Sequence, residues 1–115
     1  VSNTERKSIL EIPMPLTSNL NPPIWHTAGY VFGWEYVKKK LKEILDKNKP
    51  FFYLIHPADF LDQDDLDNKY TLALERMDKN YKCKIENLEN MLHFITGHGY
   101  KGVKLIDIAK LYYEK

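Results

Sequence analysis

One histidine of this chain stands where side chains often do chemistry, at the end of an apolar run. Residues 51–55 read FFYLI, and His56 and Pro57 follow at once. A short run this rich in aromatic residues predicts a strand buried on both faces, as in parallel sheets covered by helices. Because proline cannot donate a ladder hydrogen bond, the strand should end there. His56 would then lie at the carboxyl edge of a sheet, where α/β proteins bind ligands.

An imidazole at that edge could act as acid, base or metal ligand near neutral pH, or it could be a structural histidine bonded to a nearby carbonyl. Asp59 could orient the ring of His56, or it could cap a helix. We expect His26 in a surface loop, His93 at or near the core, and His98 exposed in a turn. No two histidines have the spacing of helical metal ligands, so we predict no metal site formed wholly within this chain.

Composition limits the class of protein. The 115 residues are 43% hydrophobic and 13% aromatic, enough for the core of a single domain, 1–115. The formal charge of +1 gives no general attraction to nucleic acid or to an anionic membrane. The single cysteine, Cys83, excludes an internal disulfide framework and a cysteine zinc site. One cysteine does not decide the compartment, and the cytoplasm is only slightly favoured. No run approaches the roughly 20 apolar residues of a membrane helix. Because residue 1 is Val, we expect a processed chain or a piece of a longer protein.

The elements alternate along the chain. We expect a short strand over 8–12, a proline-rich loop over 13–23, a helix over about 34–47 and the apolar strand 51–56. A helical stripe then runs over about 70–96, either as one helix or as two that break near 81–84, and Gly97 ends it. Residues 99–103 form a turn with a short strand, and a last helix starts near 105. This order predicts an α/β fold.

Two charged runs have ordinary explanations. The lysines of the helix over 34–47 form a solvated face, and no stacking aromatics or glycine-rich phosphate loop accompany them, so no nucleic acid partner is predicted. Five aspartates within 59–67 suggest calcium, but the loop glycine and the closing glutamate of a calcium loop are missing. Helix capping is the favoured role for one of them.

The sequence Leu54-Ile55-His56, followed by Pro57, resembles the last motif of the polysaccharide deacetylase family, the NodB homology domain. Residues 11–13, the loop at 25–30 and the segments 88–95 and 102–107 are similar to their counterparts in order and placement, so the resemblance covers about 8–113. It implies the C-terminal part of a distorted (β/α) barrel with few parallel strands and a long helix. The domain 1–115 would then be partial.

The resemblance also implies a reaction, the metal-assisted removal of N- or O-acetyl groups from a polysaccharide or sugar. His56 matches the acid that protonates the leaving group, and Leu54 matches the apolar residue that holds the acetyl methyl. Period two along a strand places both side chains on one side, and we add Trp25 to the substrate-binding residues.

The family's Asp-Asp motif, its H-x-x-x-H metal ligands and its arginine motif lie upstream of the region that this chain matches. We therefore expect no cofactor in this chain, a divalent metal such as zinc only in a complete parent domain, and no activity from the chain alone. The expected partners are an acetylated carbohydrate and either the remainder of the barrel or a second copy. The alternative function is a non-catalytic α/β interaction module, with its long helix as a partner surface and with unpaired strand edges that would invite association.

Overall fold

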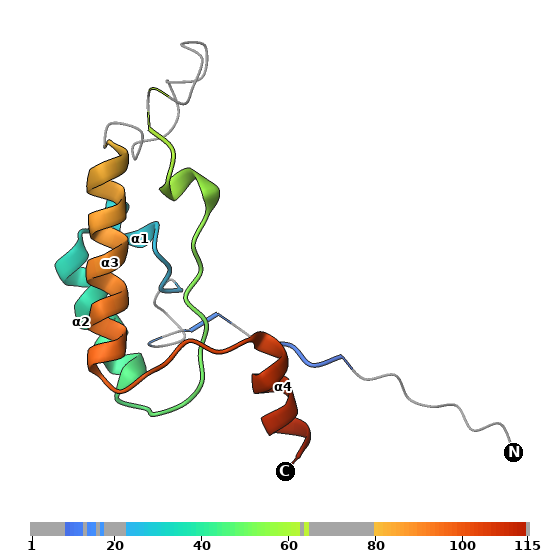
Figure 1. Cartoon of the computed structure of the whole chain (residues 1–115). Helices are drawn as coiled ribbons and strands as arrows, with labels where there is room; N and C mark the ends of the chain where they lie inside the picture. Colours follow the sequence, from blue (N-terminus) through green and yellow to red (C-terminus); the bar gives the residue numbers. More distant parts are fainter. Residues whose placement is uncertain are drawn as a thin grey trace, which may run out of the picture.

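The structure, a computed structural model, describes residues 9–12, 14–15, 17, 23–62, 64 and 80–114. Within these ranges the regular elements are helices (Figure 1). They are α1 (Ala28–Phe32), α2 (Trp34–Leu45), the 3-10 turn η1 (Pro57–Asp59), α3 (Tyr81–Gly97) and α4 (Leu105–Tyr113).

The predicted α/β fold is wrong, and with it the fragment of a distorted barrel. The part of the chain that the structure describes contains no β-strand. Residues 9–12, 51–56 and 99–103 are not paired as strands, and the side chains of 51–55 are partly exposed instead of buried. Leu54 accepts a backbone hydrogen bond from His26 N–H at 3.0 Å, but no ladder continues from it. A strand needs a neighbouring strand to pair with, and the local sequence cannot supply one.

The helix predicted over about 34–47 is confirmed as α2. Its apolar stripe is buried and faces the rest of the core. Three of its lysines pair with acidic side chains one turn away, as Lys42 Nζ does with Oδ2 of the C-cap residue Asp46 at 2.7 Å. Such pairs at the surface contribute little to stability, as expected of a solvated face.

Within the segment 70–96, where a long helical pattern was predicted, the structure describes the helix α3, which begins at Tyr81. Asn80 is extended and its side chain accepts the Cys83 N–H at 2.8 Å, the geometry of an N-cap. One unbroken helix over 70–96 is therefore excluded, and residues 70–79 lie outside the described residues. The predicted stop is confirmed, because Gly97 is the last residue of α3.

The core is built around α2, which contacts both α1 and α3 (Figure 1). Gly29 of α1 allows close approach to α2, since a Cβ there would lie 2.1 Å from Cζ3 of Trp34. Phe51 and Tyr53 of the extended segment pack against this core. The buried apolar residues are Ile24, Ala28, Val37, Leu41, Ile44, Leu45, Met91 and Ile95.

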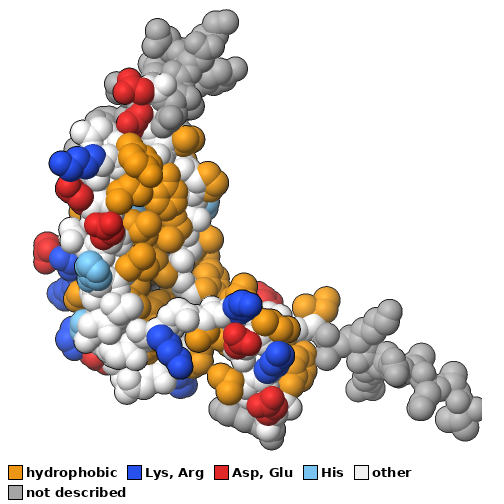
Figure 2. Space-filling view, in the orientation of Figure 1, with side chains coloured by type: hydrophobic (Ala, Val, Ile, Leu, Met, Phe, Trp, Pro, Cys, Tyr) orange, Lys and Arg blue, Asp and Glu red, His pale blue; other side chains and the backbone are white. Residues whose placement is uncertain are grey.

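The last predicted helix is confirmed as α4, but it buries none of its residues. Figure 1 shows it set apart from the body that α1, α2 and α3 form. Apolar side chains are exposed on it among charged ones (Figure 2). A helix with this composition normally packs against a partner. The exposed apolar residues of α4 are Leu105, Ile106, Leu111, Tyr112 and Tyr113.

Candidate functional site

His56 lies at the end of the extended segment with its side chain exposed. It is the N-cap residue of η1, with extended backbone angles (φ −103°, ψ 151°). Its backbone N–H donates to Asp59 Oδ2 at 2.8 Å, so the predicted alternative of a capping role for Asp59 is confirmed. The side chain of His56 is therefore open to solvent, and the capping box with Asp59 restrains the residue.

Asp59 reaches the side chain of His56 in two ways. Its backbone N–H donates to the His56 side chain, which completes a capping box, and its carboxylate is linked to the ring through Thr27. The aspartate is completely buried, and Thr27 Oγ1 donates a hydrogen bond to its Oδ1 at 3.2 Å. The same Thr27 oxygen lies 3.4 Å from His56 Nδ1. Sequence reasoning missed Thr27, because residues 27 and 56 are far apart in the chain. Its position just before α1 suggests a helix cap, yet its side chain makes no capping hydrogen bond there.

His26 was expected in a surface loop, and that expectation is wrong. The side chain is completely buried, and its Nδ1 lies 3.0 Å from the hydroxyl of Tyr53. The rings of Tyr30, Trp34 and Tyr53 surround it, the nearest ring centre at 4.9 Å. His26 Nε2 has no hydrogen-bond partner among the described residues. The aromatic shell comes from three separate segments, which only the tertiary fold brings together.

Burial changes the protonation of this cluster. Desolvation lowers the pKa of His26, and the nearby Asp59 carboxylate acts in the opposite direction with a smaller effect. Desolvation also raises the pKa of the Tyr53 phenol above its ordinary value, and the charges of Asp59 and Tyr30 add to that rise. His26 is therefore held as a neutral imidazole, with Tyr53 as a neutral hydroxyl beside it.

We expect the stability of the chain to fall as the solution becomes mildly acidic. The unfolded chain binds a proton at His26 near the ordinary pKa of about 6.5, whereas the folded chain binds it only at lower pH. The contribution of His26 is thus complete above about pH 6.5 and is lost as pH falls from there toward the folded pKa. Urea unfolding from pH 8 to pH 5 measures it, with a slope of at most about 1.4 kcal/mol per pH unit for one proton.

Two variants separate His26 from the other histidines. His26→Gln removes the titration and should flatten the stability profile in this window, whereas His93→Gln changes an exposed histidine and should keep it. An unchanged profile in His26→Gln would assign the acid sensitivity to another group.

The two predicted substrate-binding residues lie in different surroundings. Leu54 and Phe52 line an apolar hollow of about 590 Å³ with residues of α4 and of the segment 9–12. Trp25 is half-buried against the core. Neither His56 nor Trp25 lines this hollow or the two others beside α4. Trp25 and His56 therefore do not share the hollow that Leu54 lines.

A buried lysine fixes the segment that follows His56. Lys84 of α3 is completely buried, and its Nζ donates to the carbonyl oxygens of Ala58, at 3.1 Å, and of Leu61. These bonds join η1 to α3 and so contribute to the placement of Asp59. A lysine in a polar helical stretch gives no sequence signal of burial, because such residues are ordinarily exposed.

The remaining candidates stand apart from His56. His93 is exposed, so its predicted packing at or near the core is wrong, while the predicted exposure of His98 is confirmed. Cys83 is a free, partly buried thiol. Among the described residues, no three His, Cys, Asp or Glu side chains come together in a way that could hold a metal ion. The divalent metal that the resemblance implies therefore finds no fitting ligand set in this part of the chain.

Comparisons of the chain with protein-family models, with curated proteins and with solved structures find no match. Separately, none of the helices described is both long and apolar enough to cross a bilayer.

Proposed function

We propose that this chain supplies the proton-donating histidine of a carbohydrate deacetylase. The observation that carries the proposal is the placement of His56, an exposed imidazole whose backbone is fixed by the buried carboxylate of Asp59. Leu54 supports it. Leu54, two residues earlier, lines an apolar hollow of a kind that suits an acetyl methyl group, and His56 is not among the residues that line that hollow.

The chemistry asked of His56 is one proton transfer. In the hydrolysis of an N-acetyl group, water adds to the carbonyl carbon, the C–N bond breaks, and acetate leaves. The amine nitrogen needs a proton as the bond breaks, and a protonated His56 would give it. For an O-acetyl group the sugar oxygen takes the proton in the same way. The base that activates water would come from polypeptide outside these 115 residues.

Acetate release tests the proposal. The longest translation product that contains these residues should release acetate from N-acetylated chito-oligosaccharides or from acetylated xylan. The 115-residue chain should release none, even with added zinc or cobalt, because it lacks the base and the metal ligands of the family. If the longer product is inactive on both substrates, the proposal is wrong. Turnover by the 115-residue chain would show that the argument from missing motifs is wrong.

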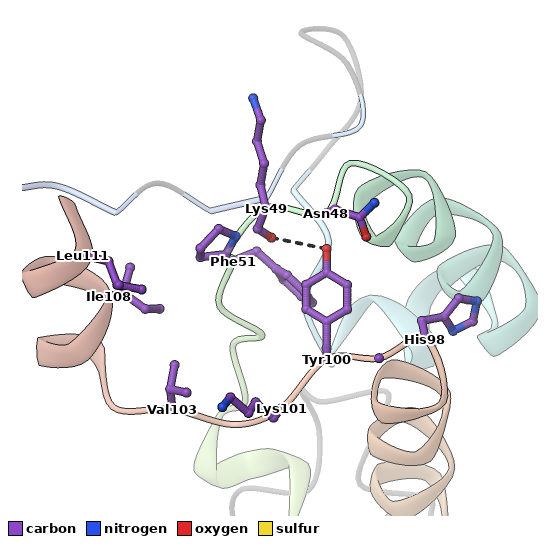
Figure 3. Close-up of a pocket in the computed structure, with 11 residues that line it drawn as sticks. Asn48, Lys49, Phe51, His98, Tyr100, Lys101, Val103, Ile108 and Leu111 are labelled. Atoms are coloured by element: carbon purple, nitrogen blue, oxygen red, sulfur yellow. Dashed lines mark hydrogen bonds between the residues drawn. The ribbon is translucent and has the colours of Figure 1, made fainter. Parts of the chain in front are cut away.

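The exposure of α4 favours a second candidate function, that of a non-catalytic module that binds a second copy of itself. Three hollows separate α4 from the segment 48–54, and residues of α4 line each of them. In Figure 3, Ile108 and Leu111 face Phe51 across one of these hollows, while the Tyr100 hydroxyl bonds to the Lys49 carbonyl at 3.3 Å. A group of exposed apolar side chains such as the one on α4 commonly marks a protein–protein interface.

We expect the chain to associate through this helix. Sedimentation velocity should show a mass that rises with protein concentration, and Ile106→Glu should return the chain to a monomer because it places a charge on the apolar face of α4. Val31→Glu is the matched control, since Val31 is 55% exposed and Ile106 is 57% exposed. A wild-type chain that stays monomeric at every concentration would remove this candidate.

A further inference from the structure

The hollow in Figure 3 combines apolar walls with positive charge. Its volume is about 340 Å³, within the range of sites that bind small molecules. Two lysines line it, and no aspartate or glutamate does. The apolar side chains that line it are Pro50, Phe51, Val103, Ile108 and Leu111.

One wall of the hollow is held in place by the core. Phe51 packs against the helical core, and the ring of Tyr100 meets it edge to face, with ring centres 5.3 Å apart. The Tyr100 hydroxyl lies 3.0 Å from the carbonyl oxygen of Leu45 and 3.3 Å from that of Lys49. These contacts fix the segment after α3 against the end of α2. This wall is therefore formed before a ligand arrives, which lowers the entropy cost of binding.

The opposite wall is α4. Ile108 and Leu111 face Phe51 across the hollow in Figure 3. Apolar groups that face each other across water favour an apolar group in place of that water. The space between the two walls thus suits a hydrocarbon chain.

The positive charge comes from Lys49 and Lys101. Both are exposed, and they lie on either side of Phe51 in Figure 3. Within the described part of the chain neither forms a salt bridge, whereas three lysines of α2 do. An anion at this hollow would therefore meet two charges that no described carboxylate neutralises, and their field would favour it over a cation.

We propose that this hollow binds a small amphipathic anion, a fatty acid or another single-chain carboxylate. Its hydrocarbon chain would lie between Phe51 and Ile108, with the carboxylate toward the two lysines. The inference does not rest on the proposed function, because His56 does not line this hollow.

Titration calorimetry with three small probes tests the class of ligand. Decanoate should bind the 115-residue chain, and added salt should weaken its binding because both lysines are at the surface. Decyltrimethylammonium has the same tail and the opposite charge, and butyrate has the same carboxylate and a short tail. Each should bind about tenfold more weakly or worse. No binding of decanoate, or equal binding of decanoate and decyltrimethylammonium, would overturn the inference.

Substitutions locate the site. Lys49→Gln combined with Lys101→Gln removes both charges and should weaken decanoate binding about tenfold, since one exposed ion pair contributes a factor of about two to five. Lys110→Gln is the matched control, because Lys110 is exposed on α4 and does not line the hollow. Ile108→Asp places a charge in the apolar wall and should abolish binding. Unchanged affinity in the double variant would overturn the inference, even if Ile108→Asp failed to fold.

Ile106→Glu separates this site from self-association. Ile106 does not line this hollow, so the variant should bind decanoate as the wild-type chain does. Loss of binding in it would place the site between two copies and overturn the inference. Sedimentation of the chain with vesicles of phosphatidylglycerol, without binding of free decanoate, would overturn it as well. Because none of these measurements involves acetate release, the proposed function is tested separately.

Discussion

Replacement of His56 by alanine is expected to lower kcat for acetate release about 100-fold or more, in the translation product that carries the complete deacetylase site. A positioned general acid usually contributes a rate factor of this size, which corresponds to about 2.7 kcal/mol of activation free energy. The leaving nitrogen would have to depart without a proton or take one from water. Because the side chain of His56 is exposed, the substitution should leave the fold intact.

The distribution of the loss between kcat and KM identifies the role of His56. A group that acts only in the transition state lowers kcat with little change in KM, whereas a group that only binds substrate raises KM. His93→Ala is the matched control, since His93 is also exposed but lies on α3. An unchanged kcat in His56→Ala would reject the acid role, and an equal loss in both variants would indicate a general effect on folding.

Leu41→Ala is expected to lower the free energy of unfolding by about 2–5 kcal/mol, the cost of truncating a fully buried leucine. Leu41 lies on α2 with no exposed surface, in a core that also includes Ile24 and Met91. Small proteins are stable by only about 5–15 kcal/mol, so this loss could unfold a large part of the population. Urea unfolding followed by circular dichroism measures it.

The same substitution on α4 provides the control. Leu111 is 59% exposed, so Leu111→Ala should change the free energy of unfolding by no more than about 0.5 kcal/mol at a concentration where the chain is monomeric. The pair of variants holds the chemistry constant and changes only burial. Similar losses in both would mean that α4 packs against the body in solution, contrary to the arrangement in Figure 1.

The helices were the predictable part of this fold. A helix is formed by bonds within its own segment, so the apolar spacing over 34–45 and the residues after 104 were sufficient to locate α2 and α4. The ends of α3, at Asn80 and Gly97, are local features too, because a helix cap is a contact between residues that are close in the sequence. The break that Asn80 produces was foreseen only as one of two alternatives.

The predicted β-sheet is the part of the fold that the sequence did not predict correctly. An apolar run such as 51–55 indicates a segment whose side chains can be buried. Whether its backbone pairs with another strand, and how far its side chains are buried, depend on the segments that pack beside it. In this structure Phe51 and Tyr53 pack against the helical core. The residues that alternate with them, Phe52 and Leu54, line an open hollow. The predicted burial on both faces is therefore wrong, and the neighbouring strands that it presupposed are missing from the described residues.

The candidate site divides in the same way. The sequence alone determined that His56 ends an apolar run before a proline and that Asp59, three residues later, could cap the turn. Only the tertiary structure decided that His56 is exposed, that His26 is enclosed by aromatic rings, and that Thr27 joins Asp59 to the imidazole. Caps and helical faces follow from neighbours in the chain, whereas burial and long-range hydrogen bonds arise when distant segments pack together.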